Sequence, residues 1–188
     1  MATAVQPQTA PGIKILWIPL ALFVSVGGVV GSIYLSAEMG LKACPLCFYQ
    51  RSFMMAVATI LIWGMCLPGI PASALTPLAL SSAVAGGGIA VFHTYLDATG
   101  FLECPLGITD RLPVPQESLI VFSVLVFLLI VDLFHHRQYL LQGLGAILLG
   151  GVLAAICLNE HVTPPPPVPE KPYQTELDGC RRAYREKA

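Results

Sequence analysis

Five long apolar runs constrain this chain more than any other feature of its sequence. An α-helix needs about 20 predominantly apolar residues to cross the hydrocarbon core of a membrane, and each run is close to that length. The runs are Ile15–Ser36, Cys47–Leu67, Ala74–Leu96, Ser118–His135 and Tyr139–Leu158. Of the 188 residues, 55% are hydrophobic and 11% are charged, against about 25% charged in a typical soluble domain. The sequence therefore predicts an all-α membrane protein, with a four-helix transmembrane bundle and a fifth transmembrane helix within residues 15–158.

The first and last runs each admit a second interpretation. The first is longer than the roughly 7–15 apolar residues of a signal-peptide core, and Lys14 is the one charge before it, so we expect it to be retained as an anchor. The fifth run contains Gly143, Gly145, Gly150 and Gly151. Glycines at these positions suit a re-entrant hairpin as well as a spanning helix.

Short linkers between the runs predict antiparallel neighbours, so the connecting segments alternate between the two sides of the membrane. One side receives residues 1–14, and the other receives the loops 37–44 and 97–117 together with a tail over residues 159–188. This second side holds four of the six cysteines, namely Cys44, Cys47, Cys104 and Cys180. Cys157 lies at the same end of the last run, and Cys66 lies at the opposite end of the second.

Charge does not say which side is cytoplasmic, because basic residues lie near the membrane on both sides. Disulfide chemistry persists in oxidising compartments. We therefore expect the cysteine-rich side to be periplasmic or extracellular and residues 1–14 to be cytoplasmic. The net charge of −1 favours neither nucleic acid nor an acidic substrate, and four histidines offer little material for a buried metal cluster. We expect no metal.

The motif Cys44-Pro-Leu-Cys47 begins the second run, and Arg51 follows one helical turn later. Two thiols separated by two residues can close a small disulfide, and both the first turn of a helix and a nearby cation favour the thiolate. Pro45 suits that first turn, where its missing N–H costs nothing. A structural disulfide or half of a zinc site is the alternative, but no second cysteine pair has zinc-ligand spacing. The motif predicts a redox-active pair.

The stretch from Lys42 to Arg51, with Tyr49 and Arg51 following the cysteine pair, resembles the signature of the bacterial disulfide bond formation protein B family. Cys104 lies in the second loop, as the family places it. The resemblance covers the first four runs. It implies an inner-membrane oxidoreductase that reoxidises a periplasmic, DsbA-like thioredoxin-fold protein by disulfide exchange. Electrons would then pass to a quinone cofactor, either ubiquinone or menaquinone.

The chain departs from the family pattern in its second loop and its tail. Family members usually carry two cysteines in that loop, whereas residues 97–117 contain Cys104 alone. A fifth helix would return the chain to the same side, so Cys180 can replace the missing cysteine in space. The intervening Pro164–Pro167 segment favours an extended spacer of about 3 Å per residue. Cys157 remains the alternative partner of Cys104.

With Cys180 in place of the missing loop cysteine, the resemblance leads to a hypothetical role for each candidate residue. A Cys104–Cys180 disulfide would accept electrons from the partner, Cys180 would attack Cys44, and the Cys47 thiolate would reduce the quinone. Arg51 would bind the quinone, with Tyr49 and His93 as further candidates. Each of these three also has a structural alternative, since Arg51 and Tyr49 suit the membrane interface and His93 could fill a polar gap between helices.

Two rival functions remain open. A vitamin K epoxide reductase-like oxidase also couples a membrane CxxC motif to a quinone, but its active pair lies late in the bundle, whereas Cys44 and Cys47 follow the first run. The second rival is a non-enzymatic scaffold or metal-handling protein with structural disulfides. For the second loop, Pro105, Pro113 and Pro115 predict extended, accessible backbone that could enter a partner's active site.

Overall fold

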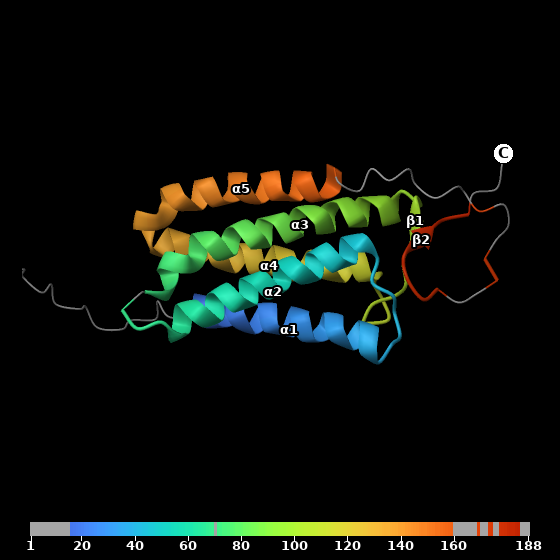
Figure 1. The fold of residues 1–188 in the computed structure, drawn as a ribbon, viewed down its shortest axis with the longest axis horizontal. Coiled ribbons are helices and arrows are strands. Elements are labelled where there is room, and N and C mark those ends of the chain that lie inside the picture. Colours follow the sequence, from blue (N-terminus) through green and yellow to red (C-terminus); the bar gives the residue numbers. More distant parts are fainter. Residues whose placement is uncertain (1–15, 70, 160–168, 170–172, 175–176, 185–188) are drawn as a thin grey trace, which may run out of the picture.

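The computed structural model describes residues 16–69, 71–159, 169, 173–174 and 177–184. The described part of the chain contains five long helices: α1 (Trp17–Ala37), α2 (Pro45–Cys66), α3 (Thr76–Ala98), α4 (Val114–His135) and α5 (Leu140–Asn159). They lie side by side along one long axis (Figure 1). Each is long and apolar enough to cross a membrane, which confirms the predicted all-α membrane protein. The predicted segment 1–14 and the Pro164–Pro167 spacer lie outside the described residues.

The fifth run forms one continuous helix of 20 residues, so the re-entrant hairpin considered for it is wrong. Short 3₁₀ turns precede α3 and α5, namely η1 (Ala72–Leu75) and η2 (Arg137–Tyr139). The loops after α1 and α3, the end of α5 and the tail residues 177–184 all lie at one end of the bundle, on the right in Figure 1.

Prolines mark the starts of α2 and α4. Cys44 is the N-cap of α2, where its Sγ accepts a hydrogen bond from the Cys47 N–H at 3.2 Å, and Pro45 follows as the first helical residue. Helix α4 begins at Val114, four residues before the predicted start, because Pro115 sits in its first turn, where no N–H is needed. Pro105 and Pro115 are buried. The predicted extended, accessible backbone is therefore wrong for these two prolines.

Helix α3 lies at the centre of the bundle. It packs against α2, α4 and α5, whereas α1 packs against α2 and α4. The main apolar core includes Leu80 of α3 and Phe122 of α4, both almost fully buried. Phe122 fills the space beside Gly86, where any Cβ would collide with its ring. A glycine on α3 thus lets the aromatic ring of α4 approach the backbone closely.

A two-stranded antiparallel sheet joins the tail to the second loop. Strand β1 (Leu102–Glu103) pairs with β2 (Arg181–Arg182), with Leu102 opposite Arg182 and Glu103 opposite Arg181. The sheet caps the end of the bundle at which α2 begins and α3 ends (Figure 1). It brings the tail next to the cysteine pair at the start of α2.

A glycine also lets α5 pack closely against α3. A Cβ at Gly150 would lie 2.5 Å from the Ser81 carbonyl oxygen and 2.8 Å from Val84 Cβ, whereas a Cβ at the neighbouring Gly151 would meet nothing within 4 Å. The face of α5 that carries Gly150 therefore approaches the α3 backbone, and Gly151 points away from it.

We predict that Gly150→Ala destabilises the protein relative to Gly151→Ala. Both changes gain the same helix propensity, but overpacking against the Ser81 carbonyl should cost about 1–3 kcal/mol at position 150. Thermal unfolding of the two variants in the same detergent measures the difference. Equal midpoints would contradict the packing of α5 on α3.

Candidate redox site

Four cysteines meet at the capped end of the bundle. A disulfide joins Cys104 to Cys180, with their Cα atoms 4.2 Å apart, so the partner of Cys104 is Cys180 and not Cys157. The Cys44 and Cys47 thiols form a second pair with their sulfurs 3.0 Å apart. Reactive atoms of Cys44, Cys47, Cys180 and His93 all lie within 4.8 Å of one another. The two pairs are therefore close enough to exchange a disulfide after small side-chain rotations.

The tail is held in place on the first loop. The Lys42 N–H donates to the Asp178 carbonyl at 2.6 Å, and the two side chains form an ion pair at 2.7 Å. This contact raises the pKa of Lys42 and lowers that of the Asp178 carboxyl. Gly179 lies against the Lys42 carbonyl so closely that a Cβ would be 2.9 Å from its oxygen. Cys180 therefore follows a segment clamped beside the start of α2.

The same tail is held on the second loop. Beyond the β1–β2 pairing, the Ala183 N–H donates to the Phe101 carbonyl at 3.2 Å, and the Arg182 guanidinium lies 5.1 Å from the centre of the Phe101 ring. The tail thus bridges both loops, and Cys180 lies between Cys104 and the CxxC pair.

His93 is the buried centre of the site. Its side chain is fully buried, and Nε2 lies 3.4 Å from Cys104 Sγ and 3.9 Å from Cys44 Sγ. Gln50 holds the other ring nitrogen through a 3.4 Å contact between Gln50 Nε2 and His93 Nδ1. Ser118 Oγ in turn donates to Gln50 Oε1 at 2.8 Å. This chain of polar contacts orients the imidazole toward sulfurs from both pairs.

Gln50 and Ser118 were not singled out from the sequence. Gln50 stands one turn after Cys47 in a mostly apolar helix, and a polar side chain in a membrane helix usually faces a partner inside the bundle. That rule could have identified Gln50. Nothing in the local sequence distinguishes Ser118 from a serine that bonds its own helix backbone.

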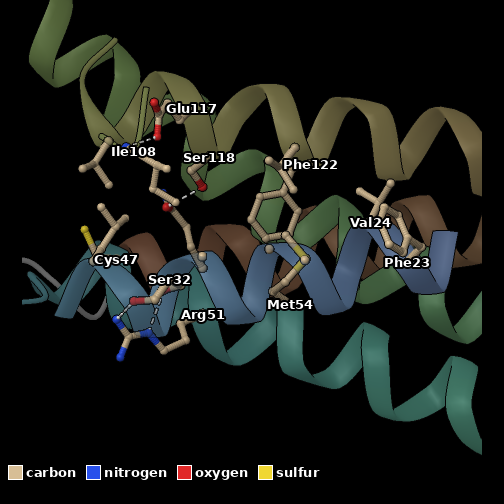
Figure 2. Close-up of a pocket in the computed structure, with 17 residues that line it drawn as sticks. Phe23, Val24, Ser32, Cys47, Arg51, Met54, Ile108, Glu117, Ser118 and Phe122 are labelled. Atoms are coloured by element: carbon tan, nitrogen blue, oxygen red, sulfur yellow. Dashed lines mark hydrogen bonds between the residues drawn. The ribbon is translucent and has the colours of Figure 1, made fainter. Parts of the chain in front are cut away.

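A cavity of about 290 Å³ opens beside Cys47 between α1, α2 and α4. Its walls are mostly apolar, with Phe23, Val24, Met54 and Phe122 among them, and Cys47, Gln50 and Arg51 line the end near the cysteines. Figure 2 shows Cys47 and Arg51 at one end of the cavity and Phe23 at the other. The cavity can take a flat apolar molecule with a polar edge.

Hydrogen bonds tie Arg51 to the end of α1. Its Nε donates to Ser32 Oγ at 2.8 Å, and its Nη2 donates to the Ser32 carbonyl at 2.8 Å and to Ser36 Oγ at 2.6 Å. A guanidinium at the carboxyl end of a helix also interacts favourably with the helix dipole. Arg51 therefore joins α1 to α2 and holds a fixed positive charge at the cavity wall.

A short hairpin after Cys104 covers part of the cavity. The Glu117 carboxylate accepts hydrogen bonds from the Ile108 N–H at 2.9 Å and the Thr109 N–H at 2.8 Å. Gly107 lies against the same carboxylate, which leaves no room for a Cβ. Ile108 consequently forms part of the cavity wall and packs against Gly31 of α1.

The three residues predicted to bind the quinone lie in three different parts of the structure. Arg51 lines the cavity, whereas His93 lies among the sulfurs. Tyr49 packs against a small apolar cluster of Leu46, Ile89 and Ala154, which Cys44 and Cys157 also contact. Cys66 is exposed at the other end of α2.

The Cys44 thiol, just before the first residue of α2, has a lower pKa than an ordinary thiol. The hydrogen bond with Cys47, and then the hydrogen bond and charge of His93, lower the pKa of Cys44 well below that of an ordinary thiol, against the opposing effect of burial. A thiolate is the nucleophile in disulfide exchange, and a low pKa also makes a sulfur a better leaving group. Cys44 is suited to exchange with the second pair.

Comparison with known proteins agrees with this site. A family model described as "Disulfide bond formation protein DsbB" matches residues 14–117. A curated relative, disulfide bond formation protein B of Aromatoleum aromaticum, is 37% identical over 90 residues, which cover 45% of this chain and 54% of the relative. The match thus spans about half the relative's length. No solved structure matches the chain. Helix α5 and Cys180 lie beyond the family match.

We predict that Cys44 remains reactive in acid when the Cys104–Cys180 disulfide is intact. Because its pKa is lowered, Cys44 stays a thiolate at about pH 6. At that pH an ordinary thiol of pKa about 8.5 is a thiolate in fewer than about 1 in 100 molecules. Alkylation rates, followed by mass spectrometry of the Cys44 peptide across pH, measure this. The unfolded protein is the control, and Cys47→Ala should move the midpoint of alkylation upward. A Cys44 profile that follows the unfolded chain would contradict the assignment.

Proposed function

The chain belongs to the DsbB family of disulfide bond formation proteins, and from this premise we propose that it is a membrane thiol:quinone oxidoreductase. It reoxidises a periplasmic, DsbA-like thioredoxin-fold protein by disulfide exchange. Its multi-pass bundle lies in the bacterial inner membrane, with the redox cysteines on the periplasmic side. The observation that carries the proposal is the grouping of Cys44, Cys47 and Cys180 around His93, next to a cavity that Cys47 lines.

Electrons enter through the Cys104–Cys180 disulfide. A thiolate of the reduced partner attacks Cys104, which forms a mixed disulfide and releases the Cys180 thiolate. The second thiol of the partner then resolves the mixed disulfide. The partner leaves oxidised, and Cys104 and Cys180 remain as two thiols. The tail and the second loop, joined by the β1–β2 pairing at the end of the bundle, support this entry point.

Electrons then move to the CxxC pair. The Cys180 thiolate attacks Cys44 of a Cys44–Cys47 disulfide and releases the Cys47 thiolate, after which Cys104 attacks Cys180 and releases Cys44. The products are a Cys104–Cys180 disulfide and two thiols at Cys44 and Cys47. The structure has this arrangement of bonds, which corresponds to the step just before the quinone is reduced.

His93 moves the proton between the two pairs. Its Nε2 faces both Cys104 and Cys44 at 3.4 and 3.9 Å, so the same nitrogen can protonate a departing thiolate and accept a proton from an attacking thiol. The Gln50 amide keeps the ring in this orientation. A position among the sulfurs supports proton transfer for His93 more directly than contact with the quinone.

The cavity beside Cys47 fits a quinone ring. Its apolar walls match the ring and the start of an isoprenoid chain, and Arg51 offers a fixed cation for a ring oxygen. Cys44 and Cys47 would supply two electrons to a bound quinone as they become a disulfide; the Cys47 thiol would supply one proton, and solvent the second. The bonds to Ser32 and Ser36 position the Arg51 guanidinium before the quinone arrives, as stabilisation of developing negative charge requires.

We predict that the purified protein bleaches the ultraviolet absorbance of a quinone when it is supplied with a reduced thioredoxin-fold dithiol protein. The dithiol protein should become oxidised in equal amount. A scaffold or metal-handling protein would leave both absorbance and thiol content unchanged, and that result would overturn the proposed function. Using ubiquinone and menaquinone analogues in parallel also compares the two quinones.

We predict that Cys180→Ser abolishes oxidation of the partner while quinone binding stays intact. The variant lacks the disulfide that receives electrons, but Cys180 is not needed to form the apolar walls of the cavity beside Cys47. Turnover and quinone binding, measured separately, test the two halves of this statement. Cys66→Ser, at the opposite end of α2, is the matched control and should keep full turnover. Full activity of Cys180→Ser would contradict the relay.

A further inference from the structure

The redox site also has the composition of a metal centre. Cys44 and Cys47 come from the start of α2, His93 from the end of α3 and Cys180 from the tail, and one ligand atom of each lies within 4.8 Å of the others. Four-coordinate zinc with bonds of about 2.3 Å to sulfur separates its ligand atoms by about 3.8 Å. Side-chain rotations that change the separations between the ligand atoms by about 1 Å would reach that geometry from the observed one.

His93 has a polar neighbour at each ring nitrogen, as a metal-binding histidine needs, and the Gln50 amide can turn over to suit a bound metal. Such a histidine bonds the metal through one ring nitrogen, while the other nitrogen contacts a second polar group that fixes the ring. In this protein Nε2 faces the sulfurs, and Gln50, itself held by Ser118, contacts Nδ1. Because the metal takes the lone pair of Nε2, the ring hydrogen moves to Nδ1. The Gln50 amide turns over to accept it, and the amide then donates to the Ser118 hydroxyl.

The oxidation state of the protein decides whether the ligands are complete. In the structure Cys180 is bonded to Cys104, which leaves Cys44, Cys47 and His93 as three ligands. Reduction of the disulfide releases Cys180 as the fourth. The clamp between Lys42 and Asp178 does not involve the disulfide, so it keeps Cys180 beside the start of α2 after reduction.

We propose that the fully reduced protein binds one divalent cation of the zinc class through the Sγ atoms of Cys44, Cys47 and Cys180 and Nε2 of His93. Binding involves no electron transfer, since the cation replaces the thiol protons, which pass to solvent. Three thiolates and one imidazole form a tetrahedral set that suits Zn²⁺. The sequence does not reveal this site because its ligands lie in three separate segments, although Cys44 and Cys47 have the spacing of half a zinc site.

The bound cation holds the reduced protein out of the disulfide relay. While they bind the metal, Cys44 and Cys47 cannot pass electrons to an oxidant, and Cys180 cannot re-form its disulfide with Cys104. Disulfides at either pair remove ligands and release the metal. The site therefore responds both to soft cations and to the supply of oxidant, and its existence does not depend on the identity of that oxidant.

Cobalt provides a direct test with the full-length protein in detergent. Protein reduced with a phosphine, without oxygen, is titrated with Co²⁺, and absorption is recorded in the thiolate charge-transfer and tetrahedral ligand-field regions. We expect both sets of bands to saturate at one Co²⁺ per chain and to disappear when Zn²⁺ is added. The protein with both disulfides formed should show neither.

Variants separate this site from adventitious thiol binding. Cys180→Ser should weaken Co²⁺ binding at least about 10-fold, and Gln50→Leu should weaken it about 10-fold to 100-fold through loss of the ring contact. Cys66→Ser is the matched control and should bind as the parent does. The proposal is overturned if reduced protein shows no tetrahedral bands, or if Cys180→Ser binds Co²⁺ as tightly as the parent. Neither readout uses a partner or a quinone, so the outcome is independent of the test of the oxidoreductase activity.

Discussion

The close packing of α3 against its neighbours is the constraint on which the redox site depends. Gly86 admits the Phe122 ring of α4, and Gly150 of α5 comes within contact of the Ser81 carbonyl. In lipid, where apolar side chains gain little by leaving their solvent, such close approach is a main source of helix association. Helix α3 carries His93 near its end and leads into the second loop, and α5 returns the chain to the same end. Cys104 and Cys180 can meet because both helices are held there.

Polar groups within the apolar bundle determine the finer arrangement. A donor or acceptor left without a partner in lipid is costly, so polar side chains in the helices bond to one another. The contacts among His93, Gln50 and Ser118 connect α3, α2 and α4 behind the sulfurs, and the bonds from Arg51 to Ser32 connect α2 to α1. These contacts hold the His93 ring and the Arg51 guanidinium in place on either side of the thiols.

The helices could be predicted from the sequence because the bilayer requires long apolar segments and little else. Their ends were less predictable, as α4 shows, since Pro115 reads as a loop residue until it is seen in the first turn of a helix. The gathering of Cys44, Cys47, Cys104 and Cys180 on one side also followed from the order of the helices. The partner of Cys104 did not, because Cys157 and Cys180 both lie at that end of the bundle.

The sequence by itself determined that this protein is a helical membrane protein, where its helices lie, that it carries a CxxC motif, and that four cysteines gather at one end of the bundle. Those properties follow from runs of apolar residues and from the order of short segments, both of which are local. The tertiary structure alone decided that His93 faces the sulfurs, that Tyr49 lies away from the cavity and that Gln50 and Ser118 orient the imidazole. It did so because the rotation of each helix about its axis depends on packing against the others, and that rotation decides which side chains meet.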